Sequence, residues 1–218
     1  MTRLVLAHAG DDEAARIARE LGARLVTPRA LSQRGWRHYP VGGGADRACV
    51  GDGESSESIE PIDAAALTGV ITRIAAVQPA DLPHIAAVDR GYIAAEMTAF
   101  LLSFLGGLPC PVVNRPTPSS LMGPGWTPLR WRAVAIANGL PPAAPDDVGE
   151  RIVAAFGRCL GARDEASASA VLALARAAGV ELLAVRVTAA GRFASAEPWA
   201  PLAPDALAAV AARLGGAA

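Results

Sequence analysis

The chain has 218 residues, of which 52% are hydrophobic and 5% are aromatic, and it carries a net charge of −1 at pH 7. This composition predicts a globular protein with one sizeable core or two small lobes, and it excludes an intrinsically disordered chain. The balanced charge and the few aromatic residues argue against nucleic acid as a partner. The chain contains no lysine, which excludes phosphate-binding loops that end in Gly-Lys and enzymes with a covalently bound pyridoxal cofactor.

Neither export nor membrane insertion is expected. The N-terminus has no basic start followed by an apolar block, and the apolar stretch at residues 94–108 is interrupted by polar residues and glycines. The three cysteines, Cys49, Cys110 and Cys159, are far apart and predict neither a disulfide framework nor a zinc site. We therefore expect a cytoplasmic protein that does not contact membranes.

The first half of the chain has the pattern of a parallel α/β sheet. Buried strands are predicted at residues 3–8 and 23–27, on either side of an amphipathic helix at residues 11–21. The glycine-rich and polar passage at residues 41–60 is expected to be a loop. Alternating apolar residues at 70–74 predict a third strand.

Two further helices are well marked in the middle of the chain. The first covers residues 92–105 and is followed by a short strand at residues 110–114. The second begins after Thr127, whose side chain is placed to cap it, and runs to Asn138. Pro128 occupies its first position, where the missing N–H of proline costs nothing.

The pattern changes after a proline-rich linker at residues 141–147. Gly157-Arg158 predicts the two-residue turn of a β-hairpin, although a helix is a rival interpretation there. A helix is predicted at residues 165–178, a second hairpin around residues 189–191 and a terminal helix at residues 204–214.

The order of these motifs resembles the ATP-grasp ligases, in particular the branch that modifies peptides. The strand and turn Pro-Val-Val-Asn-Arg-Pro at residues 111–116, and the helix that ends in Gly-Leu-Pro at residues 139–141, resemble the family's pre-ATP-grasp region. Residues 151–161 resemble the family's strand pair around a Gly-Arg turn, and Gly-Arg-Phe at residues 191–193 resembles the approach to its metal-binding strand. The two stretches together cover about half of the chain.

The resemblance implies an α/β fold with two domains. The first, at residues 1–141, would be a parallel-sheet domain like the pre-ATP-grasp domain. The second, at residues 148–218, would be a smaller and reduced α+β lobe like the C-terminal part of the ATP-grasp fold.

The sequence departs from the family where the chemistry would be expected. Active members have a central lobe that supplies lysines to the nucleotide phosphates, whereas only residues 142–150 lie between the two matching regions here. The family's metal-binding strand reads F-x-E-x-N, but Phe193 is followed by Ser195 and Glu197 at those positions. Arg186 stands where an upstream metal-binding acid is expected, and its charge would repel Mg²⁺. The resemblance therefore implies a degenerate protein with no catalytic residues.

Two groups of polar residues are candidate sites. The first could bind a carboxylate or a phosphate and consists of Asn114, Arg115, Ser119 and Arg130. In the alternative interpretation, Arg115 fixes the proline-rich loop and Arg130 lies on a solvated helix face. The second is a weak metal-site candidate at the start of the first helix and consists of His8, Asp11 and Asp12. Acids at a helix start more commonly stabilise the helix dipole.

The sequence favours a non-catalytic scaffold that binds a protein, a peptide or a small molecule in a biosynthetic pathway and needs no cofactor. Its partner could be a full-length ATP-grasp ligase or a second copy of the chain. The alternative is a subunit of an ATP-dependent carboxylate-amine ligase that another chain completes, and this alternative would require ATP and Mg²⁺. A third interpretation is an ordinary α/β protein that binds a small molecule. The missing lysines and the altered metal-binding positions favour a protein that is not an enzyme.

Overall fold

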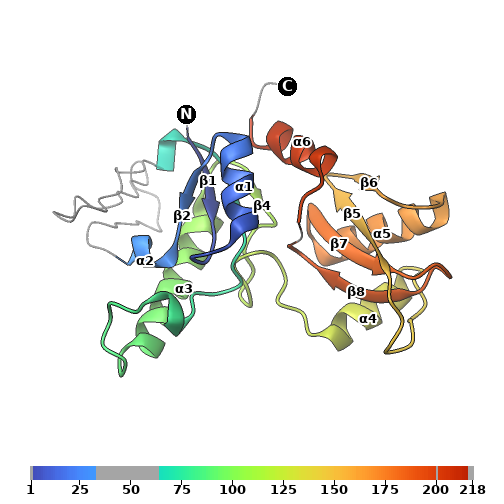
Figure 1. Ribbon diagram of the computed structural model, residues 1–218, viewed down its shortest axis with the longest axis horizontal. Helices are drawn as coiled ribbons and strands as arrows, with labels where there is room; N and C mark the ends of the chain where they lie inside the picture. Colours follow the sequence, from blue (N-terminus) through green and yellow to red (C-terminus); the bar gives the residue numbers. More distant parts are fainter. Residues whose placement is uncertain (1, 33–63, 200, 216–218) are drawn as a thin grey trace. The chain divides into compact units, whose positions relative to one another are not determined.

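The computed structural model describes residues 2–32, 64–199 and 201–215 (Figure 1). The chain divides into two compact units, residues 1–121 and 122–218. This division precedes the predicted boundary linker at residues 141–147, because the helix before that linker belongs to the second unit. The predicted loop at residues 41–60 lies outside the described residues. In the part of the chain that is described, no helix is both long enough and apolar enough to cross a membrane.

The first unit is built on a parallel four-stranded sheet with the order β2-β1-β3-β4. Its strands are β1 (Thr2–Leu6), β2 (Arg24–Val26), β3 (Leu67–Thr72) and β4 (Val112–Val113). All neighbouring strands pair in parallel. The prediction of a parallel α/β sheet for this part of the chain is therefore confirmed.

In the described part of this unit, the α-helices beside the sheet are α1 (Asp12–Leu21), the short α2 (Pro28–Leu31) and α3 (Arg90–Gly107). Figure 1 shows α1 and α3 on opposite faces of the sheet. Leu101 and Phe104 of α3 share a buried core with apolar residues of all four strands. Burial of these side chains is the main source of stability for the unit.

The second unit is built on an antiparallel four-stranded sheet with the order β6-β5-β7-β8. Its strands are β5 (Glu150–Ala155), β6 (Arg158–Leu160), β7 (Leu182–Val187) and β8 (Phe193–Glu197). All neighbouring strands pair antiparallel. The protein thus combines a parallel sheet with a separate antiparallel sheet, and the predicted α/β fold class is confirmed.

The helices of this unit are α4 (Pro128–Ala137), α5 (Glu165–Ala178) and α6 (Pro204–Arg213). Side chains of α4 and α5 form one buried core with apolar residues of the sheet, so both helices cover the same face (Figure 1). Asp164 caps α5 by accepting a hydrogen bond from the backbone N–H of Ser167, and this bond lowers the pKa of Asp164.

The β5–β6 hairpin is confirmed, but its turn lies one residue earlier than predicted. Ala155 pairs with Arg158, so the turn residues are Phe156 and Gly157. Both have positive φ angles, 50° and 81°. Two successive positive φ angles are typical of the type I′ turn, whose twist matches that of the flanking strands. Phenylalanine is an unusual residue in this conformation, which is why the sequence pattern pointed to Gly157-Arg158.

Candidate functional site

Polar side chains gather where the central strands of the parallel sheet end. Leu6 of β1 and Thr72 of β3 are partners in the sheet register, and His8 and Arg73 follow them along the chain. His8 donates from Nδ1 to the carboxylate of Asp81, whose two oxygens lie 2.8 and 3.0 Å away. This edge of an open α/β sheet is where such folds commonly bind ligands.

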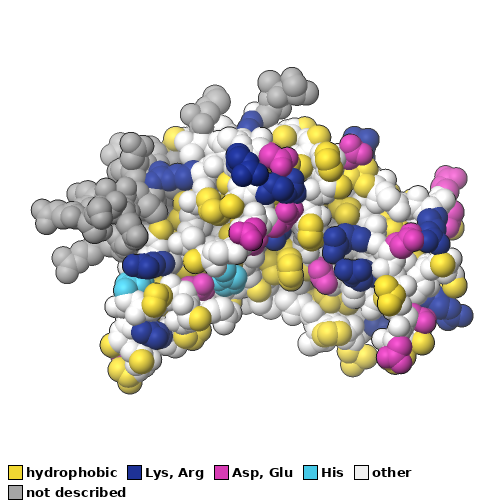
Figure 2. All heavy atoms as spheres, viewed as in Figure 1, with side chains coloured by type: hydrophobic (Ala, Val, Ile, Leu, Met, Phe, Trp, Pro, Cys, Tyr) yellow, Lys and Arg dark blue, Asp and Glu magenta, His cyan; other side chains and the backbone are white. Residues whose placement is uncertain are grey.

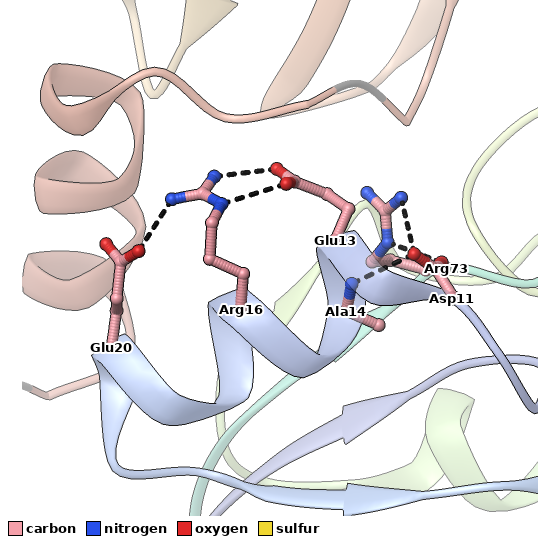
Figure 3. A network of polar contacts seen from close by, with 6 residues as sticks. All are labelled: Asp11, Glu13, Ala14, Arg16, Glu20 and Arg73. Atoms are coloured by element: carbon pink, nitrogen blue, oxygen red, sulfur yellow. Dashed lines mark hydrogen bonds and ion pairs between the residues drawn. The ribbon is translucent and has the colours of Figure 1, made fainter.

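Asp11, one of the metal candidates, makes structural hydrogen bonds at this edge (Figure 3). Its Oδ1 accepts a hydrogen bond from the backbone N–H of Ala14 at 2.9 Å, and its Oδ2 accepts one from Nε of Arg73 at 2.9 Å. Burial alone would raise the pKa of Asp11, but the hydrogen bonds from Arg73 and Ala14, together with the positive charge of Arg73, lower it. Asp11 therefore caps α1 and joins it to the end of β3.

The acids and the arginine further along α1 pair with one another. Arg16 donates to both carboxylate oxygens of Glu13, at 2.9 and 2.7 Å, and to Glu20 at 2.8 Å (Figure 3). These contacts join residues three and four apart on the helix surface, where such pairs stabilise a helix only slightly. Glu13 and Glu20 are therefore both engaged by Arg16 and do not form a metal-binding cluster on α1.

The structure does not bring His8, Asp11 and Asp12 together as ligands of one ion. His8 pairs with Asp81, Asp11 pairs with Arg73, and the side chain of Asp12 is exposed. Within the described ranges, no group of three or more His, Cys, Asp or Glu side chains could hold a metal ion.

Arg115 makes its hydrogen bonds to the backbone that connects α3 to β4. Its guanidinium donates to the carbonyl oxygens of Gly106, Leu108 and Cys110 at 3.2 to 3.3 Å. Carbonyl groups at the end of a helix lack partners within the helix, so these bonds satisfy part of the C-terminus of α3. This is the arrangement expected of a residue that fixes the proline-rich loop.

The other three residues of the predicted carboxylate- or phosphate-binding site lie in separate environments. Asn114 is 2% exposed and has a positive φ of 52°. Ser119 lies in an exposed turn, where its hydroxyl is 3.1 Å from the hydroxyl of Thr117. Arg130 belongs to the second unit, where its guanidinium lies over the ring of Trp126 at 5.4 Å from the centroid. That position over the ring is typical of a cation–π contact.

Arg186, Ser195 and Glu197, the altered family positions, lie together on the antiparallel sheet. Arg186 of β7 is directly opposite Ser195 of β8, and Glu197 is opposite Ala184. All three polar residues are partly exposed, and Nη1 of Arg186 donates to the carbonyl of Gly149 at 3.3 Å. The sheet therefore presents a cation in the middle of the row where the resemblance implies a metal-binding acid.

Sequence reasoning missed Arg151, which is the cross-strand partner of Arg186 on the other side. Residues directly opposite in antiparallel strands share a face of the sheet, with Cβ atoms about 5 Å apart. The charge of Arg151, just before four apolar strand residues, was a usable signal. The pairing of β5 with β7 was not, because α5 separates these strands in the sequence.

A cavity of about 390 Å³ lies in the first unit between α2 and α3. Its walls are mostly apolar and include Leu31, Ile93, Met97, Phe100 and the single carboxylate of Glu96. Such a mixture of apolar walls with one polar group is typical of small-molecule sites.

No protein-family model matches this sequence, and no curated protein matches it. Its fold, however, is similar to solved structures over the whole chain. Macrocyclase MdnC from Microcystis aeruginosa MRC, bound with its precursor peptide MdnA, has a TM-score of 0.66 at 11% identity, with 100% of both chains covered. The ATP-grasp ligase PsnB, complexed with minimal precursor, Mg and ADP, has a TM-score of 0.60 at 11% identity, covering 97% of this chain and 98% of PsnB.

The chain has the fold of these ATP-grasp ligases. A second PsnB structure, complexed with precursor peptide PsnA2 and AMPPNP, has a TM-score of 0.58 at 12% identity and covers 97% of this chain and 99% of PsnB. At such low identity the similarity establishes the architecture, and the α/β fold that the sequence predicted is the one observed. The chemistry has to be argued from the residues of this chain.

Proposed function

We propose that this chain is a non-catalytic ATP-grasp-like scaffold that binds a peptide or a protein in a biosynthetic pathway. The observation that carries the proposal is the position of Arg186, which puts a positive charge in the middle of the sheet row opposite Ser195. The family resemblance implies an acid there that would hold Mg²⁺. A guanidinium repels Mg²⁺ instead, so the row cannot organise a magnesium nucleotide in the family's manner.

The short connection between α4 and β5 supports the same proposal. Only residues 138–149 join these two elements. A nucleotide-binding lobe inserted at this point would need many more residues. The absence of lysine from the whole chain removes the usual phosphate-binding side chain as well. The altered metal-binding positions, the short connection and the absence of lysine together support the proposal of a degenerate nucleotide site.

Binding of a peptide is supported by the fold neighbours. MdnC is described as bound with precursor peptide MdnA, and PsnB as complexed with its precursors. A chain that keeps this fold and has lost the nucleotide site would still offer a peptide-binding surface. It could present a precursor peptide to a catalytic ligase or hold the peptide during its modification.

The test is an assay for ligase chemistry on the purified chain. Mg-ATP and an acid-rich peptide that also contains amines are incubated with the protein. Release of ADP is followed by a coupled enzyme assay, and the peptide mass by mass spectrometry. We expect no ADP above the rate of a protein-free control and no change in peptide mass. ATP-dependent loss of one water from the peptide would overturn the proposal, since it would demonstrate a carboxylate-amine ligase.

A further experiment addresses the partner. The chain is mixed with a full-length ATP-grasp ligase from the same source and the mixture is separated by size-exclusion chromatography. Co-elution is expected if the scaffold works beside a ligase. The same mixture, assayed for ADP, tests the alternative in which another chain completes a catalytic subunit. ADP formation that depends on both chains would favour that alternative.

A further inference from the structure

Three polar side chains form one row across the antiparallel sheet. Arg186 of β7 lies directly opposite Arg151 of β5 and, on its other side, opposite Ser195 of β8. All three therefore project from the same face, with neighbouring Cβ atoms about 5 Å apart. The neighbouring residues Ile152 and Val185 belong to the core with α4 and α5, so the row projects from the opposite face.

The row carries two positive charges that no carboxylate neutralises within the described residues. The Arg151 side chain is exposed and makes no hydrogen bond or ion pair there, and the Arg186 side chain is bonded only to the carbonyl of Gly149. Glu150, the chain neighbour of Arg151, projects from the other face and is paired with Arg163. Like charges directly opposite each other destabilise a sheet, and an anion bound between them would remove that cost.

Figure 2 shows arginine side chains together over the part of the second unit where Figure 1 places β7. Among the described strand residues, the acid on this face is Glu197, which stands opposite Ala184, two residues along β7 from Arg186. Its negative charge disfavours a multiply charged ligand such as a triphosphate more than it disfavours a single carboxylate. The charge pattern therefore suits one carboxylate group without a metal ion.

We infer that the row of Arg151, Arg186 and Ser195 binds a carboxylate side chain of an acidic peptide, an inference that rests on the proposed peptide-binding function. A guanidinium presents parallel N–H groups that match the two oxygens of a carboxylate. Two guanidinium groups on adjacent strands can hold one carboxylate from both sides, and the Ser195 hydroxyl can donate a further hydrogen bond. The site thus selects glutamate or aspartate side chains over neutral ones.

The test measures binding of the full chain to two fluorescent synthetic peptides by anisotropy. One peptide alternates glutamate with alanine, and the matched peptide has glutamine in place of every glutamate. We expect the glutamate peptide to bind about tenfold or more tightly, and Arg151→Gln and Arg186→Gln each to weaken it about tenfold. Arg158→Gln is the matched control, because Arg158 of β6 lies directly opposite Ala155, the last residue of β5, on the same face of the sheet and is exposed. It should bind as the unmodified chain does.

The Arg151→Gln variant should fold normally, because the Arg151 side chain is exposed and makes no hydrogen bond or ion pair within the described residues. A loss of binding in this variant can therefore be assigned to the site. Equal binding of the two peptides, binding of neither, or unchanged binding by Arg151→Gln would overturn the inference. Displacement of the glutamate peptide by inorganic phosphate at equal concentration would also overturn it, in favour of a phosphate site. None of these binding measurements involves ATP turnover. The proposal of a non-catalytic scaffold is tested separately, by the assay for ADP release.

Discussion

Arg73, directly after β3, donates from Nε to Oδ2 of Asp11, the N-cap of α1, at a distance of 2.9 Å. The Arg73 side chain is 7% exposed and the Asp11 side chain 21%, so the pair lies largely away from water. Asp11 also accepts a hydrogen bond from the backbone N–H of Ala14. The Asp11 carboxylate therefore caps the N-terminus of α1 and also holds this helix to the end of β3, a central strand of the parallel sheet.

Replacing Asp11 with alanine should destabilise the protein by about 2–3 kcal/mol. The change removes a helix cap, worth about 1 kcal/mol, and deprives a buried guanidinium of its carboxylate. Urea denaturation followed by circular dichroism measures the loss. Asp12→Ala is the matched control, because Asp12 is the exposed neighbouring acid and contributes only to the helix dipole, about 0.5 kcal/mol. Equal losses for both variants would contradict the structural role of Asp11.

The Asp11 carboxylate should make stability depend on pH in the acid range. The pKa of Asp11 is lowered in the folded protein, because the hydrogen bonds and charge of Arg73 outweigh burial. Its contribution is therefore complete above the unfolded value of about 3.9 and is lost as pH falls through the lower folded pKa. Asp11→Asn keeps a capping side chain without the charge. The stability gap between this variant and the unmodified chain should be constant from pH 6 to 8 and should shrink below about pH 4. A gap that does not change down to pH 2 would be inconsistent with this account.

Gly157→Ala should destabilise the hairpin between β5 and β6 by about 1 kcal/mol. The φ of Gly157 is 81°, and an added Cβ would meet no atom within 4 Å, so the whole effect comes from the backbone conformation. Gly91→Ala is the control, because Gly91 lies in α3 and its added Cβ also meets nothing. It should stabilise the protein by about 0.5–1 kcal/mol, since alanine favours helix. Thermal unfolding should therefore show a lower melting temperature for Gly157→Ala and a higher one for Gly91→Ala.

Arg115→Gln should destabilise the first unit by about 1–2 kcal/mol, because three backbone carbonyls lose their donor. Hydrogen exchange of the amides around residues 106–114 should accelerate in the variant. Arg132→Gln is the control, because Arg132 lies on an exposed face of α4. It should change neither the stability of the protein nor the hydrogen exchange of these amides. Peptide binding should be unaffected by Arg115→Gln, and weakened binding without a loss of stability would instead restore Arg115 as a ligand-binding residue.

Local signals in the sequence were enough for most of the helices. α5 begins and ends where it was predicted, because Asp164 caps it and Gly179 ends it in the left-handed conformation. β4 is two residues long and not the five predicted, since Pro109 and Pro111 limit regular pairing there. The turn at Phe156 was misplaced because nothing in the sequence marks a phenylalanine for positive φ.

The candidate site depended on contacts that the sequence does not encode locally. Arg186 and Ser195 were singled out by the family resemblance, but their direct opposition follows from the register of β7 and β8. Arg151 joins them only because β5 pairs with β7 across the intervening α5. Arg115 could be placed correctly on its loop, whereas its three carbonyl partners became evident only in the folded chain.

If this ATP-grasp fold no longer uses a nucleotide, as we propose, millimolar Mg-ATP should not change its melting temperature. We predict an unchanged melting temperature with Mg-ATP and with Mg-ADP. A ligand present at a hundred times its dissociation constant stabilises a protein by about 2.7 kcal/mol, which for a chain of this size raises the midpoint by roughly 5 to 10 °C. A rise of that size would contradict the account and make Arg151 and Arg186 candidate phosphate ligands.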